Sequence, residues 1–425
     1  MKNFNKAILA LILLLSTSFF SLITTTQRLF LINSYVYKTL IIGLVIGTII
    51  VNLMFNSEQY QKAKNMIFLP STIMMLIAFI AVMIGTQIVY QQTILTTIKN
   101  SYFYGMLVVY FWLTIFTEDD FFDYILTLTA WISGLYALII MIQSMLYIHQ
   151  GPVFLDYGQF GLNPLFGNLG LIFGFPRIAV AADFISFGLL ISLVGIMMKR
   201  TKRNIIINSC LAGLDLFFII FISGTRMYIM IDLLMVAYTI AVMLWQKYKV
   251  LVVTAGSFVI TLVLVALPTI AKGFTSGERS VSYDIRKEEI VYYFNQIFKH
   301  HFLGIGFPDA KRFDQILHGF HGITLQHFGP QYFLEDVGIL GILATFGILG
   351  VIWLLTLLVD LYRSWKNSQS PYASMLLIGY IIITAFTLSL FNVQRILYLF
   401  IILYCLDYLT KKKSQHQEEQ IKWSL

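Results

Sequence analysis

The chain has 425 residues, of which 58% are hydrophobic and only 12% are charged. A soluble domain carries roughly a quarter charged residues, so the composition excludes an ordinary soluble protein and predicts one embedded in lipid. The formal net charge of +8 would suggest a nucleic-acid partner in a soluble protein. Here the basic residues collect between apolar runs, which is typical of membrane topology, so we expect no nucleic-acid partner.

Runs of about 20 apolar residues, the length needed to cross a bilayer core about 30 Å thick, recur along nearly the whole chain. They predict an all-α integral membrane protein, with one polytopic domain over 1–425 and about 12 transmembrane helices. In chain order the runs lie near 7–25, 39–55, 66–90, 102–117, 121–148, 178–198, 204–222, 227–246, 249–270, 334–361, 372–391 and 396–410. The first run is long for a signal peptide and no small-residue cleavage site follows it, so we expect it to stay as an anchor.

The two cysteines, Cys210 and Cys405, both fall inside predicted helices. Neither therefore indicates a disulfide framework or a cysteine-based metal site.

Basic residues are concentrated in alternate connections between the predicted helices. The positive-inside rule places the more basic set in the cytoplasm, and both termini with it. The intervening connections carry fewer basic residues, namely Arg28 and Lys38, Lys99, Arg226, and Arg395. The more basic set consists of Lys62 and Lys64; Lys199, Arg200, Lys202 and Arg203; Lys247 and Lys249; Arg363 and Lys366; and Lys411, Lys412 and Lys413.

Two connections, 149–177 and 272–333, are much longer than the others, and both face outward on this topology. The first is rich in glycine, proline and aromatic residues, which predicts a loop that rests at membrane level. The second holds five of the seven histidines. It is too aromatic for disorder, and long loops in compact proteins are usually functional.

An amphipathic helix is predicted within the second loop, just after a charged stretch at 286–289. We expect it to lie in the outer membrane interface and to end before Gly304 and Gly306, which break helical geometry. The residues that recur on its apolar face are Ile290, Phe294, Ile297, Phe298 and His301.

Four short motifs stand in the predicted outward connections. Arg286 precedes a helix that leads into a Leu-Gly-x-Gly turn at 303–306, His327 begins a segment that runs into a Gly-rich helix start at 338–341, a Ser-Gly-Thr-Arg turn lies at 223–226, and Arg177 stands before a helix. Together they resemble the O-antigen ligase and O-antigen (repeat-unit) polymerase superfamily of polytopic bacterial membrane proteins. The resemblance covers about 177–341, and Phe328 departs from it by standing where the family usually has Asn.

The resemblance implies a polymerase that joins oligosaccharide repeat units linked to undecaprenyl pyrophosphate, at the outer face of the bacterial cytoplasmic membrane. The product would be a surface polysaccharide, capsule, exopolysaccharide or O-antigen. One alternative is a ligase that transfers finished glycan to a final acceptor, and another is a transporter or flippase of the same lipid-linked glycan. The expected partners are the lipid-linked oligosaccharide, membrane lipids and other polysaccharide-assembly proteins.

Arginines suit such a donor, because the guanidinium pairs with two phosphate oxygens and stays charged. Arg177, Arg226, Arg286 and Arg279 all map to the outer face and are the predicted pyrophosphate ligands. Each has a structural alternative: Arg177 and Arg226 can extend to lipid headgroups, Arg286 can pair with Glu289, and Arg279 can be a solvated loop residue. Because arginines supply the charge stabilisation, we expect no metal and no cofactor.

The attacking hydroxyl of the acceptor must lose a proton, and a histidine or a carboxylate of raised pKa can accept it. His327 and Glu335 are the predicted catalytic residues, with His321 and His301 as secondary candidates. The structural alternatives are an ordinary interfacial histidine for His327 and, for Glu335, a favourable charge at a helix start.

Three acids, Asp183, Asp215 and Asp232, fall within predicted helices, where a charge is costly and suggests function. Asp183 and Asp232 are secondary site candidates. Structural ion pairs with Arg177 and Arg226 are the alternative, and in a transporter the acids would line the path.

A metal site is conceivable at His318 and His321, which are three residues apart with Asp314 nearby. Gly319 and Gly322 argue against a helix there, so a solvated loop is the favoured interpretation.

Overall fold

The computed structural model describes residues 1–17, 34–55, 66–148, 171–172, 175–176, 178, 182–198, 201–245, 247–254, 256–258, 261, 265, 280–319 and 332–423. Within these ranges the protein is helical apart from one short antiparallel pair, β1 with β2, in which Leu171 lies opposite Pro176. The predicted all-α class is therefore confirmed.

The elements follow one another along the chain in this order: α1 Lys2–Ser16, α2 Ser34–Phe55, α3 Leu69–Tyr90, α4 Ile94–Ser101, the 3-10 helix η4 Tyr102–Met106, α5 Leu107–Phe116, α6 Phe121–Ile148, β1 Leu171–Ile172, β2 Phe175–Pro176, α7 Ala182–Met197, α8 Lys202–Phe217, the π-helix η6 Phe218–Ser223, α9 Arg226–Trp245, α11 Ser280–Gln296, α12 Lys299–Phe302, α13 Ala310–His318, α14 Ile339–Asn367, α15 Pro371–Thr384 and α16 Ile396–Trp423.

Six helices of the described chain are long and apolar enough to cross a membrane: Tyr37–Phe55, Leu69–Tyr90, Phe121–Leu146, Lys202–Ser223, Arg226–Trp245 and Ile339–Asn367. Four further apolar helices are shorter: Ala182–Met197, Lys249–Phe258, Pro371–Thr384 and Ile396–Thr410. The count of about 12 spans is not established, because α1 has only 15 residues and the run near 102–117 divides into η4 and α5.

The outer face of α3 shows why the protein needs lipid. Ile73, Ile77, Ile80, Ile84 and Ile88 are each at least 44% exposed, and a continuous apolar stripe of this kind is unfavourable in water. When the stripe faces lipid acyl chains, its exposure carries no free-energy penalty, and the helix satisfies its own backbone hydrogen bonds.

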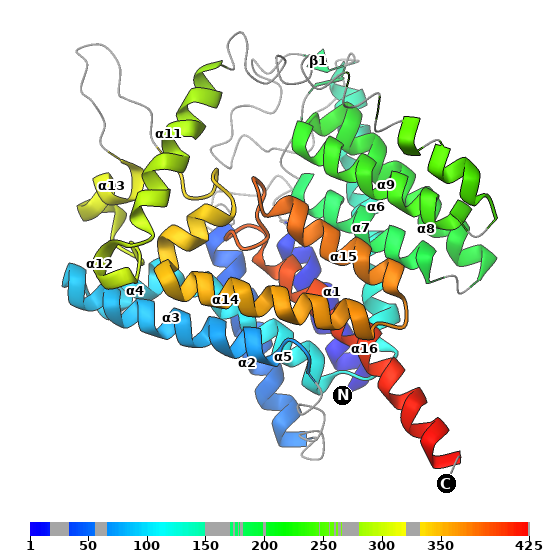
Figure 1. Ribbon diagram of the computed structural model, residues 1–425, viewed down its shortest axis with the longest axis horizontal. Coiled ribbons are helices and arrows are strands. Elements are labelled where there is room, and N and C mark those ends of the chain that lie inside the picture. Colours follow the sequence, from blue (N-terminus) through cyan, green and yellow to red (C-terminus); the bar gives the residue numbers. More distant parts are fainter. Residues whose placement is uncertain are drawn as a thin grey trace.

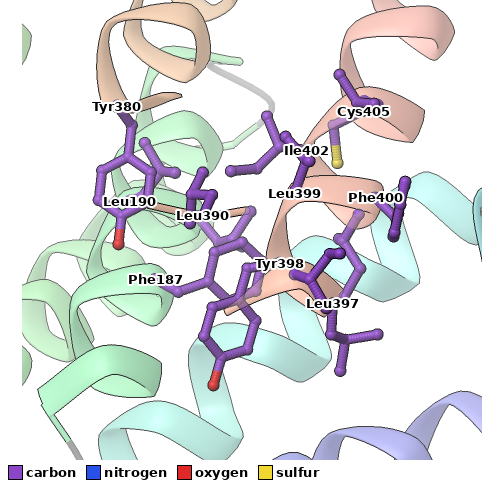
Figure 2. Close-up of a cluster of buried hydrophobic side chains, with 14 of the residues drawn as sticks. Phe187, Leu190, Tyr380, Leu390, Leu397, Tyr398, Leu399, Phe400, Ile402 and Cys405 are labelled. Carbon is purple, nitrogen blue, oxygen red and sulfur yellow. The ribbon is translucent and has the colours of Figure 1, made fainter. Parts of the chain in front are cut away.

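Helix α7 is the centre of the bundle and is buried on all sides. It packs against α6, α8, α9 and α15. Figure 2 shows the core where it meets α16: Phe187 stacks on Tyr398 with ring centroids 4.7 Å apart, beside Leu190 and Tyr380.

Polar contacts divide the molecule into two ends. At one end Lys2 lies 2.9 Å from Asp120, and Asp360 accepts a hydrogen bond from the backbone N–H of Ser71. Both chain termini lie on the lower side of the view in Figure 1. The segments around Lys38, Asp183, Glu335 and Arg395 come together at a second end, here called the loop end.

Helix α14 is broken at Gly347, whose φ of +57° lies in the left-handed region. The chain at 303–306 docks into the break, where the N–H groups of Ile305 and Gly306 donate to the carbonyls of Ala344 and Thr345 at 2.8 and 3.1 Å. A Cβ on Gly347 would lie 2.0 Å from the carbonyl oxygen of Phe302. The close approach of the two segments therefore requires glycine there.

The predicted amphipathic helix exists as α11, but it differs from the prediction in two respects. It ends at Gln296, and the chain then passes through left-handed residues at His300 and His301. Its buried residues include Glu289 and Tyr293, whereas Phe294 of the predicted apolar face is 54% exposed. The reason is that Tyr293 packs into a small core with Ile305, Val337 and Ala344. Ile290, Phe294 and Phe298 of the predicted face are therefore exposed, whereas Ile297 of the same face is buried.

Candidate functional site

An arginine, an aspartate and a tyrosine from three distant segments meet at the loop end. Arg395 precedes α16, Asp183 lies in the first turn of α7, and Tyr228 lies in the first turn of α9. The Nε atom of Arg395 lies 3.0 Å from Oδ2 of Asp183 and donates to the Tyr228 hydroxyl at 2.9 Å. Tyr228 in turn donates to Oδ1 of Asp183, which closes the triangle. Burial lowers the pKa of Arg395, but Asp183 and Tyr228 together raise it above its usual value, so the guanidinium stays charged.

Glu335 lies beside this triangle, in the turn that leads into α14. Its backbone carbonyl accepts a hydrogen bond from the side-chain amide of Asn392 at 3.0 Å, which fixes the turn to the segment that bears Arg395. The pKa of Glu335 is raised above its usual value, mainly by burial. The positive charges of Lys38 and Arg395 lower this pKa, and the negative charges of Asp336 and Asp183 raise it. We call Lys38, Asp183, Glu335 and Arg395 the charge cluster.

A cavity of about 260 Å³ opens next to the charge cluster. Glu335 and Asn392 line it from one side, and Lys99, Asn100 and Tyr102 line it from the other. Further aromatic and apolar walls come from the Gly306–Pro308 turn and from α14. Glu335 is exposed and lines this cavity. The arrangement offers a carboxyl of raised pKa, polar amides and positive charge around one space, as expected for a site that binds and deprotonates a polar ligand.

Two of the predicted site residues, Glu335 and Asp183, are brought together in the charge cluster. Arg286 lies exposed on α11, where its charge acts on Glu289, whose carboxylate accepts a hydrogen bond from the backbone N–H of Phe333. Arg286 is thus linked to the turn that carries Glu335, although it does not line the cavity.

The other predicted residues lie apart from the charge cluster or outside the described residues. The side chains of Arg226, at the start of α9, and His301, in the left-handed turn, are both exposed. Asp232 is buried within α9 and accepts a hydrogen bond from Ser186 at 2.7 Å. The positions left undescribed, and so untested, are Arg177, Arg279, His321 and His327.

The structural alternative for Asp183 and Asp232 needs correction. An ion pair does form at Asp183, but the cation shown there is Arg395, which comes from the other end of the chain. For Asp232 the partner is the hydroxyl of Ser186, because α9 packs on α7 at this depth.

Two members of the charge cluster, Lys38 and Arg395, were not predicted as site residues from the sequence, where they bear only on membrane orientation. Each sits in a connection with few other basic residues, and Arg395 follows Asn392 in a four-residue gap between two apolar runs. The sequence feature that could have identified Arg395 as a site residue is a cation in so short a gap at the membrane boundary.

No group of three metal-binding side chains occurs in the part of the chain that the structure describes. The expectation of a loop around His318 was wrong in part. Residues 310–318 form α13, in which His318 lies 3.9 Å from Asp314, and the helix ends at Gly319, whose φ is +76°.

No protein-family model matches the chain, and no curated protein sequence matches it. Function must therefore be argued from the charge cluster, the cavity and the residue pattern.

Proposed function

We propose that the protein is a glycosyltransferase of the bacterial cytoplasmic membrane, with both termini cytoplasmic and the loop end outside. Its reaction is the joining of oligosaccharide repeat units carried on undecaprenyl pyrophosphate, as in a surface-polysaccharide polymerase. The observation that carries the proposal is the cavity at the loop end, which is lined by Glu335 and flanked by the cations Lys38 and Arg395.

The chemistry requires a base and positive charge in one place. The acceptor hydroxyl attacks the anomeric carbon of the donor sugar, the bond from that carbon to the diphosphate oxygen breaks, and the electron pair leaves with the diphosphate. Glu335 accepts the hydroxyl proton, for which its raised pKa suits it. The positive field of Lys38 and Arg395 stabilises the negative charge that develops on the leaving group.

The cations nearer the surface have a supporting role in this scheme. Arg286 on α11 and Arg226 at the start of α9 are exposed at the boundary where a lipid-linked diphosphate would lie. The sequence adds Arg177 and Arg279 as further diphosphate ligands, and His327 as the alternative base. The lipid tail would run along the exposed apolar helix faces, exemplified by Ile77 and Ile84 of α3.

A ligase that transfers finished glycan would use the same donor chemistry and differ only in its acceptor. We favour the polymerase because polymerases tolerate greater sequence drift and the family motifs of this chain are degraded. The products distinguish the two: a polymerase makes a ladder of lengths on the lipid carrier, whereas a ligase moves a preformed chain.

One observation favours a transporter or flippase. Helix α14 is discontinuous at Gly347, and discontinuous helices often form substrate sites in carriers. We prefer the enzyme because the segment that docks in this break, 303–306, leads directly into the Gly306–Pro308 turn, which forms a wall of the cavity lined by Glu335.

The experiment that tests the proposal expresses the protein in cells that lack their own polymerase and measures glycan length. We expect long polymer with the wild type and single repeat units with Glu335→Gln and Arg286→Ala. His327→Ala is tested in parallel, because it is the alternative base. The control is Arg363→Ala, at the opposite end of α14, where the side chain is 60% exposed.

Long polymer in all three site variants would overturn the enzyme assignment and favour a non-catalytic scaffold. Accumulation of lipid-linked units on the cytoplasmic side, after loss of the protein, would instead identify a flippase.

A further inference from the structure

Two carboxyl groups are sealed inside the bundle and play no part in the scheme above. Asp215 of α8 and Asp232 of α9 are both 0% exposed. Oδ1 of Asp215 accepts a hydrogen bond from the hydroxyl of Ser133 on α6 at 3.0 Å, and Oδ1 of Asp232 accepts one from Ser186 on α7 at 2.7 Å. The second oxygen, Oδ2, has no hydrogen-bond partner in either residue.

Asp183, which is partly buried, and Asp407, which is buried, are compensated differently. Oδ1 and Oδ2 of Asp183 meet Tyr228 and Arg395. The two oxygens of Asp407 accept from the backbone N–H of Ile67 at 2.9 Å and from the Tyr110 hydroxyl at 3.1 Å. A single serine hydroxyl does not offset the cost of burying an ionised carboxylate, which amounts to several kcal/mol. The sites of Asp215 and Asp232 therefore suit the neutral acid.

The hydrogen-bond geometry accommodates a proton on each acid. With the proton on Oδ1, Asp215 donates to the Ser133 oxygen, and the Ser133 hydroxyl lies 3.5 Å from the carbonyl of Ile185 to which it can donate. Protonated Asp232 likewise donates to Ser186, whose hydroxyl lies 3.3 Å from that of Tyr380. In this state the unpartnered atoms are carbonyl oxygens, which are much less costly to bury than charges.

The surroundings of the two acids are closely packed and supply hydroxyls, and the described residues place no cation in hydrogen-bond contact with either. Helix α7 contributes Gly188, at which a Cβ would lie 2.0 Å from the Ser133 oxygen and 3.4 Å from Oδ2 of Asp215. The π-helix η6 begins three residues after Asp215, and such segments are frequent at functional sites. The charge of Asp232 acts on Asp215, and the charges of Asp232, Asp183 and Arg395 act on the neighbouring Tyr380 of α15.

We propose that Asp215 and Asp232 form an intramembrane proton-binding pair that holds its protons at neutral pH. Because the two carboxyls repel each other when both are charged, the second proton leaves less readily than the first. From Asp232 the hydroxyls of Ser186 and Tyr380 lead toward the Asp183–Arg395 pair, which gives a route for proton exchange with the charge cluster. The proposal does not rest on glycosyl transfer, since it follows from burial and hydrogen bonding alone.

The test is infrared spectroscopy of the purified full-length protein in lipid nanodiscs at pH 7, since a protonated carboxyl has a carbonyl stretch that a carboxylate lacks. We expect this band in the wild type, a reduced band in Asp215→Asn and in Asp232→Asn, and a further reduced band in the double variant. Asp336→Asn removes an exposed carboxyl and is the matched control, which should leave the band unchanged.

A band that is unaltered in both single variants would overturn the proposal, because the acids would then be ionised. A band that disappears when sodium is added at constant pH would also overturn it, since the pair would then be a site for a metal cation.

Near-equal unfolding temperatures are expected for the wild type and the two Asn variants, because the amide replaces a neutral acid of the same shape. A large loss of stability in both would indicate buried charges instead.

Discussion

The Nε atom of Arg395 lies 3.0 Å from Oδ2 of Asp183, and this ion pair ties the start of α7 to the segment before α16. The side chains are 11% and 24% exposed, respectively, so most of both charges is shielded from water. Tyr228 hydrogen-bonds to both partners. The pair therefore holds three helices together and also supplies fixed charge to the cavity beside it.

Removing the arginine should leave a partly buried carboxylate without its cation. We expect Arg395→Ala to lower the free energy of unfolding by about 2–4 kcal/mol, toward the lower side of the cost of breaking a buried pair because Asp183 retains some solvent contact. The measurement is the unfolding temperature in detergent. Lys287→Ala is the matched control: Lys287 lies 3.7 Å from Asp284, the two side chains are 59% and 66% exposed, and the loss of this pair should cost no more than about 1 kcal/mol. Equal destabilisation by the two changes would contradict this interpretation.

Replacing Glu335 by glutamine should separate catalysis from folding. The amide preserves the size of the side chain, and the backbone bond to Asn392 is untouched, so we expect near-normal expression and stability. Loss of a general base should slow polymer formation by about 10²- to 10⁴-fold. The readout is glycan length in cells, together with turnover of a lipid-linked donor by the purified protein. Polymer formed at the wild-type rate would exclude Glu335 as the base.

The pH dependence of activity should follow the charge of Glu335. Burial raises the pKa of this carboxyl, and a base works only when it is deprotonated, so activity should rise with pH through that raised pKa. Lys38 lowers the same pKa, so Lys38→Met should move the acidic limb of the profile to higher pH. Asp336 raises it, so Asp336→Asn should move the limb to lower pH. Shifts in the same direction for both variants would show that Glu335 does not control the limb.

The sequence predicted the long lipid-facing helices well and the internal interruptions poorly. The runs near 66–90 and 121–148 correspond to α3 and α6 within a few residues, because apolar length alone fixes a membrane-spanning helix. The break at Gly347 could not be read from the apolar stretch around it. The break is set by the docking of residues 303–306, which are distant in the chain.

The candidate site was partly predictable for the same reason. Glu335 and Asp183 were predicted as site residues because an acid next to or inside an apolar run can be recognised from the sequence alone. Arg395 and Lys38 did not, because their role depends on partners that only the packing of α7 and α14 brings near. A sequence pattern identifies charged residues that are unfavourable in an apolar run. Only tertiary contacts determine which of these charges pair with one another.

The glycine at the α14 break should be indispensable for the shape of the cavity. Gly347 has a φ of +57°, and a Cβ there would lie 2.0 Å from the carbonyl oxygen of Phe302. Left-handed backbone costs an L-residue about 1–2 kcal/mol before any clash is counted, so Gly347→Ala should destabilise the protein by at least about 2 kcal/mol. Because the docked 303–306 chain leads directly into the turn that lines the cavity, activity should fall with it.

The matched control for this change is Gly379→Ala in α15, where nothing lies within 4 Å of the added Cβ. Alanine is favoured over glycine inside a helix by roughly 1 kcal/mol, so this variant should be as stable as the wild type or slightly more stable, with full activity. Unfolding temperatures of the two variants, measured in the same detergent, give the comparison. If Gly347→Ala matched Gly379→Ala in stability, α14 would have to be continuous in the membrane, and the docking of residues 303–306 into its break would be wrong.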